Sequence, residues 1–286
     1  MDLNDIRHYF AEEIRAVGNI RSEALVAAFA KVPREHFLGP GPWQIMSDGS
    51  ENYRTTDDAD PRHLYHNILV AIDPGRHLNN GQPSYLGFCI DSLDLDEGDR
   101  VLHVGCGVGY YTAIMAEVVG TSGQVTGVEI DADLASRARE NLAYLGQVKV
   151  AQGDGGKYDH GPCDAIFVNA GVTHPSAVWL DSLLTGGRLI IYLTVAFDDS
   201  STGRGFMLKV NRQEEGYTAR FLGGVSVFHC EGSRNEEANH RLREAFMRGA
   251  WGSVQSLRRD AHELSDGCWL HGDGFCLSTL PVSADP

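Results

Sequence analysis

Three closely spaced glycines follow the apolar run Val101–Val104, at a point where the sequence predicts a turn from a strand into a helix. Gly105, Gly107 and Gly109 form a GxGxG pattern, and residues 111–119 continue with helical periodicity. A side chain at these glycines would obstruct the tight turn and the approach of a ligand to the backbone. The pattern predicts a ligand-binding loop.

Polar residues stand where each of the next three apolar runs ends. Glu129 ends the second run, Asp154 and Gly155 follow the third, and Asn169 follows the fourth. A carboxylate at such a strand end can accept hydrogen bonds from both ribose hydroxyls of a nucleoside. Asp154 can accept a hydrogen bond from an adenine amino group. Asn169 is followed by the small residues Ala170 and Gly171, which leave room for the methyl donor and acceptor. The alternative is that the acids only cap helices or stabilise turns.

The residue that follows the third glycine separates two kinds of nucleotide cofactor. A GxGxxG dinucleotide loop requires glycine at position 110, which is Tyr110 here. Tyr110 therefore disfavours a nicotinamide-dependent oxidoreductase. It favours a loop that binds the amino-acid part of S-adenosylmethionine (SAM), and Cys106 is part of this loop. The sequence predicts SAM as cofactor and a methyltransferase as the enzyme class.

The segments that position these residues alternate between strand-like and helical patterns, which predicts βαβ units and a parallel sheet with right-handed crossovers. The strands, expected to be buried on both faces, are residues 101–104, 125–130, 148–151, 165–168 and 189–193, and the helices 111–119, 133–145 and 175–184. The predicted fold class is α/β, a doubly wound, mostly parallel, Rossmann-like sheet.

Two extensions flank this predicted core. Residues 3–37 are helical in pattern, and residues 39–80 are rich in Gly, Pro, Asp and Asn, with a strand-like interruption at 69–72, as in a substrate-covering loop. After Gly203 we expect a hairpin of residues 206–210 and 217–230, a helix at 236–250 and a short strand at 275–277. The expected domains are an extension (1–81), a SAM-binding core (82–213) and a β-rich and helical addition (214–286).

Composition excludes several classes of partner. The formal net charge is -15 and the basic residues are dispersed, which argues against nucleic-acid binding. No apolar run is long enough to span a bilayer, and the acidic N-terminus is unlike a signal peptide, so we expect a cytoplasmic protein without a membrane partner. The sequence does not predict the oligomeric state.

The cysteines and histidines show no metal-binding spacing. Without a CxxC pair or a disulfide-like rhythm, the cysteines are expected to be buried thiols, with no metal bound. They are Cys89, Cys106, Cys163, Cys230, Cys268 and Cys276.

Several motifs together resemble the protein-L-isoaspartate O-methyltransferase family. They are Val-Pro-Arg-Glu-His-Phe (32–37), Gly-Gln-Pro (81–83), the glycine turn (104–110), Gly-Asp-Gly (153–155) and Gly-Gly-Arg-Leu (186–189). The resemblance covers about residues 20–195 and implies the SAM-dependent fold, with the segment before Gln82 folding over the reactive end of the cofactor. It also places Gly81 and Gln82 at the cofactor.

One position departs from the family pattern. The family frames its active site with Thr-Ile-Ser-Gln-Pro, whereas this chain has Asn79-Asn80-Gly81-Gln82-Pro83, so the hydroxyl position is Gly81. We expect little activity on isoaspartyl peptides and methylation of another carboxylate, in a peptide or a small metabolite. The amides of Asn79, Asn80 and Gln82 would orient that acceptor; alternatively, the segment is only a turn.

A hydroxyl or amine acceptor would need a base, and His174, after the fourth strand, is the candidate. His66 and His77 are weaker candidates because they lie in the irregular segment. A third alternative is a SAM-binding accessory protein whose transfer site has decayed.

Overall fold

The computed structural model describes residues 2–47, 52–196 and 201–282. Its contacts divide the chain into two compact units: unit 1 comprises residues 1–99 and 106–152, and unit 2 comprises 100–105 and 153–286. Among the described residues, no helix has both the length and the apolar character needed to cross a bilayer.

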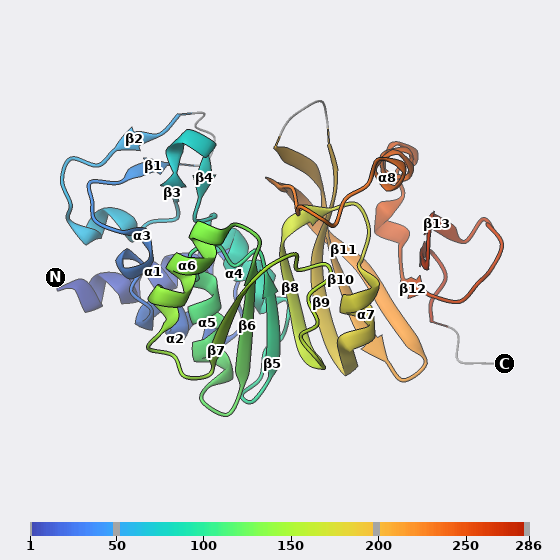
Figure 1. The fold of residues 1–286 in the computed structure, drawn as a ribbon, viewed down its shortest axis with the longest axis horizontal. Helices are drawn as coiled ribbons and strands as arrows, with labels where there is room; N and C mark the ends of the chain where they lie inside the picture. The colour runs from blue at the N-terminus through green and yellow to red at the C-terminus, as the bar shows by residue number, and fades with distance from the viewer. Residues whose placement is uncertain (1, 48–51, 197–200, 283–286) are drawn as a thin grey trace. The chain divides into compact units, whose positions relative to one another are not determined.

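Unit 1 is rich in helices (Figure 1), and helix-capping side chains set several of their starts. Asp2, Ser22 and Asp131 each accept a backbone N–H in the first turn of a helix. α1 packs against α2 and α4, while α2 packs against α5. The helices are α1 (Leu3–Gly18), α2 (Glu23–Lys31), α3 (Glu35–Leu38), α4 (Pro83–Asp91), α5 (Tyr110–Val119) and α6 (Ala132–Leu142), with 3₁₀ turns η1 (Pro61–Leu64) and η2 (Pro74–Arg76).

The segment 39–80, expected to be largely irregular, contains a small antiparallel sheet with the order β2-β1-β3-β4. Its strands are β1 (Gln44–Met46), β2 (Arg54–Thr55), β3 (Leu69–Asp73) and β4 (Leu78–Asn79). Ile45 and Val70 of this sheet form a buried cluster with Trp43 and Leu64. Only β3 was visible in the sequence, because strands of two or three residues are too short to show alternation.

Unit 1 also contains two parallel strands, β6 (Gln124–Glu129) and β7 (Val148–Gln152), covered by α5 and α6. β6 is largely buried, but every residue of β7 is half-buried or exposed. The expectation that β7 is buried on both faces is therefore wrong. β7 is the last strand of its sheet, and its side chains are only partly covered.

Unit 2 is built on one sheet that changes from parallel to antiparallel. β5 (Arg100–Val104) and β8 (Cys163–Val172) pair in parallel, and so do β8 and β9 (Leu183–Ala196). Strand β9 then pairs antiparallel with β10 (Thr202–Gln213), which forms the expected hairpin with β11 (Gly216–Phe228). The predicted α/β fold is confirmed, with a parallel region followed by added antiparallel strands.

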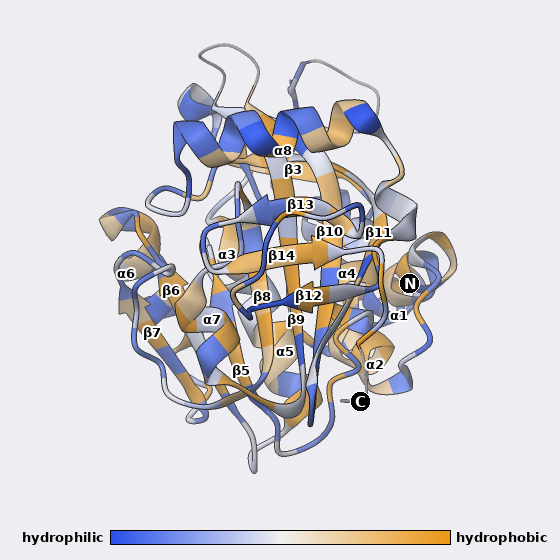
Figure 2. Cartoon of the chain, turned by 90° about the vertical axis from the view of Figure 1, so that its right-hand side faces the viewer, coloured by the Kyte–Doolittle hydropathy of each residue, from blue (hydrophilic) through white to orange (hydrophobic). Residues whose placement is uncertain are grey.

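The C-terminal part of unit 2 packs one long helix against this sheet and continues the sheet beyond β11 with short strands that end in a second hairpin. Figure 2 shows α8 as largely hydrophilic, whereas β9 and β14 are hydrophobic. α8 packs against β9 and β13, and α7 packs against β9. The elements are α7 (Ala177–Ser182), α8 (Glu236–Arg248), η3 (Trp251–Ser253), β12 (Ser256–Arg258), β13 (Cys268–Gly272) and β14 (Phe275–Ser278). The sequence indicated α8 and β14 but not β12 or β13.

Candidate functional site

The glycine turn of unit 1 is fastened to the end of β6 by Glu129. The N–H of Gly107 donates to Oε2 of Glu129 at 2.8 Å, and the N–H of Asp131 donates to Oε1 at 3.1 Å. Burial raises the pKa of Glu129, although these backbone hydrogen bonds oppose the shift. Because each carboxylate oxygen has two lone pairs, Glu129 keeps acceptor capacity for a ligand.

The space beside Gly107 suits a ligand. Gly107 has φ of +55°, and a Cβ built there meets no atom within 4 Å. The neighbouring Cys106 is not a reactive group, because burial raises the pKa of its thiol. An exposed backbone and an acid with unused lone pairs are features that fit the amino-acid and ribose parts of SAM.

Gly109 serves a different purpose, since it allows α5 to pack closely against α6. Its φ is +95°, and a Cβ would lie 2.7 Å from Cδ1 of Leu142. Glycine is required here by both backbone conformation and lack of space.

We expect Gly109→Ala to lower the free energy of unfolding by about 2–4 kcal/mol, from left-handed strain and overpacking together. Urea unfolding followed by circular dichroism measures this change. Gly107→Ala is the matched control, because it carries the strain without the clash and should cost only about 1–2 kcal/mol. Equal losses in the two variants would show that contact with Leu142 is unimportant.

In unit 2, three of the predicted cofactor residues surround the end of β5. A Cβ on Gly105 would lie 3.4 Å from the carbonyl oxygen of Asn169, which is half-buried within β8 where the pairing with β9 is irregular. A Cβ on Gly155 would lie only 2.3 Å from Cγ1 of Val104, so no other residue fits there. Gly105, Gly155 and Asn169 thus lie near the end of β5, but the expectation that Asn169 follows the end of its strand is wrong, because β8 continues to Val172.

Asp154, also in unit 2, has turn and ion-pair partners of its own. Its Oδ1 accepts the N–H of Gly156 at 2.9 Å, and Nζ of Lys157 lies 2.9 Å from its Oδ2. Gly232 also approaches closely, because a Cβ there would lie 2.2 Å from Oδ2. The turn interpretation of Asp154 is thus realised in part, and the remaining lone pairs are what it can offer a ligand.

The segment 79–82 of unit 1 is a turn anchored to the helix that follows the glycines. Oδ1 of Asn79 accepts the N–H of Gly81 at 2.9 Å, so the Asn79 side chain is engaged within the turn. Tyr111, in the first turn of α5, donates its hydroxyl to the carbonyl of Gly81 at 3.3 Å. Gln82 caps α4 without a side-chain hydrogen bond, which leaves its half-buried amide available.

Asn80 differs from Asn79 in having an unused donor. The residue is only 7% exposed, its backbone N–H donates to Val70 at 2.8 Å, and its Nδ2 atom is buried without a hydrogen-bond partner. Buried amide groups nearly always have partners, because an unsatisfied donor is costly. Asn80 Nδ2 is therefore a candidate donor to a bound acceptor.

A buried arginine, whose role the sequence did not reveal, orders the segment before this turn. Arg34, fully buried, donates to the carbonyls of Leu64 and Ile68 at 2.7 Å each and of His66 at 3.1 Å. The exposed side chains of His66 and His77 are unsuited to shielded chemistry. Arg34 could have been suspected only from its place in the Val-Pro-Arg-Glu-His-Phe motif.

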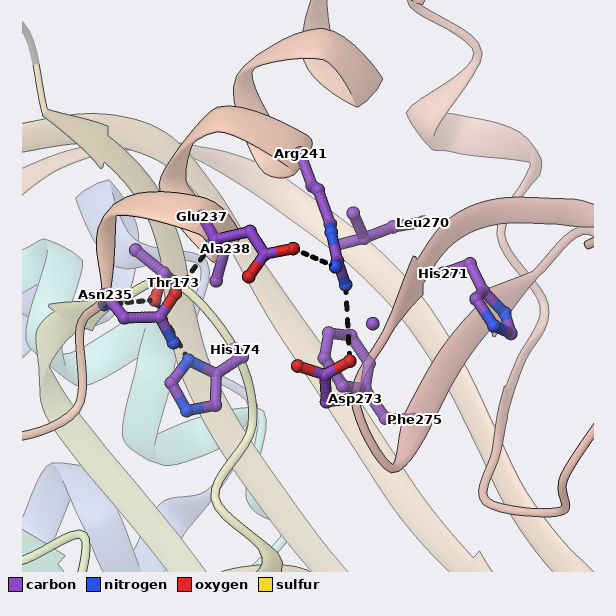
Figure 3. Close-up of a pocket in the computed structure, with 11 residues that line it drawn as sticks. Thr173, His174, Asn235, Glu237, Ala238, Arg241, Leu270, His271, Asp273 and Phe275 are labelled. Carbon is purple, nitrogen blue, oxygen red and sulfur yellow. Dashed lines mark hydrogen bonds and ion pairs between the residues drawn. The ribbon is translucent and has the colours of Figure 1, made fainter.

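His174 lies in unit 2 beside a cavity of about 110 Å³ (Figure 3). Its Nδ1 lies 2.9 Å from Oγ1 of Thr173, and burial lowers its pKa, opposed in part by Asp273. Arg241 lies across the cavity between Glu237 and Asp273 and forms ion pairs with both. A neutral imidazole at this cavity has the protonation state that a base requires.

The six cysteines, all within the described residues, form no disulfide; five are buried as expected, whereas Cys268 is half-buried, contrary to expectation. The expectation that no cysteines and histidines group together is wrong. His262, Cys268, His271 and Cys276 bring their ligand atoms within 4.8 Å of one another. The sequence did not reveal this group because its assembly depends on β13, a strand that the sequence did not indicate, and on its pairing with β14.

Comparison with known proteins identifies relatives over most of the chain. The family model of protein-L-isoaspartate(D-aspartate) O-methyltransferase matches residues 51–218. A protein-L-isoaspartate O-methyltransferase of Archaeoglobus fulgidus is 34% identical over 67% of this chain and 81% of its own length. The Thermotoga maritima enzyme of that name is also 34% identical, over 59% of this chain, which spans only half of that longer protein.

Solved structures agree at the level of the fold. A protein-L-isoaspartate O-methyltransferase aligns with a TM-score of 0.58 and 24% identity, over 84% of this chain and 69% of its own. A Plasmodium falciparum protein given the same enzyme name, crystallised with S-adenosyl-L-homocysteine, aligns with a TM-score of 0.59 and 19% identity over 79% of this chain and 98% of its own.

Proposed function

The chain belongs to the protein-L-isoaspartate(D-aspartate) O-methyltransferase family, and from this premise we propose that it methylates a carboxylate of a peptide or a small metabolite. It is a SAM-dependent methyltransferase with a Rossmann-like fold. The proposal concerns its acceptor and the residues that bind the cofactor and orient the acceptor.

We assign the ribose hydroxyls to the unused lone pairs of Glu129, and the amino-acid part of SAM to the backbone of Gly105–Gly107. Asp154 is the proposed acceptor for the adenine amino group, and Asn169 borders the reacting methyl group. Support comes from the open space beside Gly107 and from the hydrogen bond that fastens Gly107 to Glu129.

We propose that the side-chain amide of Asn80 orients the acceptor. Its buried Nδ2 has no partner, and it directly precedes Gly81, whose carbonyl accepts from Tyr111 on α5. An amide donor can orient a carboxylate and replace part of its water shell without neutralising it. Asn79 stabilises the turn in this proposal instead of touching the acceptor, because its Oδ1 is already used by Gly81.

No side chain has to remove a proton from a carboxylate acceptor. SAM, when bound, supplies a methyl group activated by its sulfonium, which an acceptor oxygen takes by in-line displacement. A carboxylate is ionised near neutral pH, so the protein's contribution is alignment and electrostatic preorganisation.

The relatives' name points to isoaspartyl peptides, but Gly81 argues for a different acceptor. Gly81 has φ of +72°, and it supplies no hydroxyl where the family pattern has serine. We therefore propose that an ordinary aspartyl or glutamyl side chain, or the carboxylate of a small metabolite, is the preferred acceptor.

Labelled SAM and a matched set of acidic peptides test this proposal. We expect incorporation into aspartyl peptides to exceed that into isoaspartyl peptides of the same sequence, and the product to release labelled methanol in base. His174→Ala should retain nearly the full rate, with no pH break from this imidazole. Faster turnover of the isoaspartyl peptide would contradict the acceptor proposal and leave the methyltransferase assignment intact.

An amine or hydroxyl acceptor is the second candidate, favoured by the lowered pKa of His174 at its cavity. Its product would survive base, and His174→Ala would then lower the rate about 10²- to 10⁴-fold. The same experiment therefore separates the two functions.

A further inference from the structure

The C-terminal hairpin of unit 2 brings together two thiols and two imidazoles. His271 and Cys276 are opposite each other in the pairing of β13 with β14, and Cys268 begins β13. His262 comes from the segment that precedes the hairpin. The ligand atoms of all four residues lie within 4.8 Å of one another.

His262 is oriented as metal-binding histidines usually are. Its Nδ1 lies 2.9 Å from the carbonyl oxygen of Asp260, which leaves Nε2 directed at the cluster, 3.5 Å from Sγ of Cys268. In protein metal sites, the second ring nitrogen commonly donates to a carbonyl or carboxylate, which fixes the tautomer and the ring direction. The Asp260 contact thus supplies the outer partner that such a ligand needs.

The unpartnered ring nitrogen of His271 is an independent indication that this group binds something. Its Nδ1 is buried and has no hydrogen-bond partner among the described residues. Its ring centroid lies 4.9 Å from that of His262, with the planes nearly perpendicular. Figure 3 shows that the His271 ring lies apart from the ion pair of Arg241 with Asp273. His271 nevertheless lines the cavity beside His174.

The donor set is specific for a soft or borderline metal. Two sulfurs and two imidazole nitrogens match tetrahedral zinc sites and are unlike the oxygen sets of calcium or magnesium. Tetrahedral zinc would separate these donors by about 3.3–3.8 Å, so the cluster needs only a small contraction.

We propose that His262, Cys268, His271 and Cys276 bind one zinc ion in a closed tetrahedral site. With four protein ligands there is no open position for substrate, so the site is structural. It fastens the segment before β13 to the hairpin, and the turn of that hairpin carries Asp273 to the cavity beside His174. Binding releases the protons of those thiols that are not already thiolates.

Metal content of the full-length purified protein tests the proposal directly. After incubation with zinc chloride and removal of excess metal, elemental analysis should find about one zinc per chain. Replacement by Co²⁺ should give the visible d–d bands and the thiolate charge-transfer bands of a tetrahedral site. A chelator should lower the Tm of the wild-type protein.

His262→Ala and Cys276→Ser should each lose the bound zinc, and the chelator should then no longer change their Tm. His262 lies outside the hairpin, so its variant tests the site even if Cys276→Ser fails to fold. Cys163→Ser is the matched control, because Sγ of Cys163 also contacts a histidine, His160, at 3.1 Å but lies outside the four-residue group. It should retain the zinc.

Three results would overturn the site. One is wild-type protein without zinc after incubation with zinc chloride. Another is equal zinc in the wild-type protein and in both ligand variants. The third is a disulfide between Cys268 and Cys276 in the protein as purified under reducing conditions and before any metal is removed, detected by mass spectrometry. None of these readouts depends on methyl transfer, so they do not bear on the proposed function.

Discussion

Glu129→Ala is expected to weaken SAM binding by about 10²- to 10⁴-fold. The substitution removes two proposed hydrogen bonds to a buried carboxylate, each contributing about 1.5–3 kcal/mol. It also leaves the N–H of Gly107 without its partner, which loosens the turn that the cofactor contacts. Both effects act on the cofactor affinity, whereas the apolar core of β6 is unchanged.

Isothermal titration calorimetry with SAM and with its demethylated product measures this loss. Glu140→Ala, which removes an exposed carboxylate on α6, is the control and should bind normally. Glu129→Gln keeps one acceptor oxygen and should lie between the two. Unchanged affinity in Glu129→Ala would show that the carboxylate only stabilises the turn.

The parallel part of the fold was predictable because its strands are continuous apolar runs. β5 and β8 are buried along most of their length, so their hydrophobicity alone identifies them. Apart from β3, the small sheet of unit 1 was not predictable, since its other strands are only two or three residues long and depend on Trp43 and Leu64 for their core. β7 shows the opposite error, because an apolar run can also form a partly exposed edge strand.

The sequence singled out candidate site residues, but it could not show which partners their side chains have. The positions of Gly107 and Glu129 followed from the strand pattern, yet the hydrogen bond between them is visible only in the structure. Asn79 and Asn80 looked equivalent in sequence, and only the fold distinguishes a turn-forming side chain from an unpartnered one. The cysteine and histidine group depends on pairing between β13 and β14, for which spacing gave no signal.

Asn80→Ala and Asn80→Asp should lower kcat/KM for the acceptor by about 10²-fold or more while leaving SAM binding nearly unchanged. Removing a preorganised donor of this kind typically costs about 10²–10³ in rate. The aspartate variant should be the worse of the two, because its negative charge would repel an acceptor carboxylate and it has no donor hydrogen when ionised. Steady-state kinetics with varied acceptor at saturating SAM measure both losses.

The free energy of unfolding of the Asn80 variants distinguishes a role in orienting the acceptor from a role in stabilising the fold. Because Nδ2 of Asn80 has no partner to lose, Asn80→Ala should change the free energy of unfolding by no more than about 1 kcal/mol. Asn4→Ala, at an exposed amide on α1, is the control and should keep both its activity and its stability. A loss of activity that only parallels a loss of stability would mean that Asn80 supports the turn. Lower activity in a stable protein with normal SAM affinity would place the Asn80 amide at the acceptor.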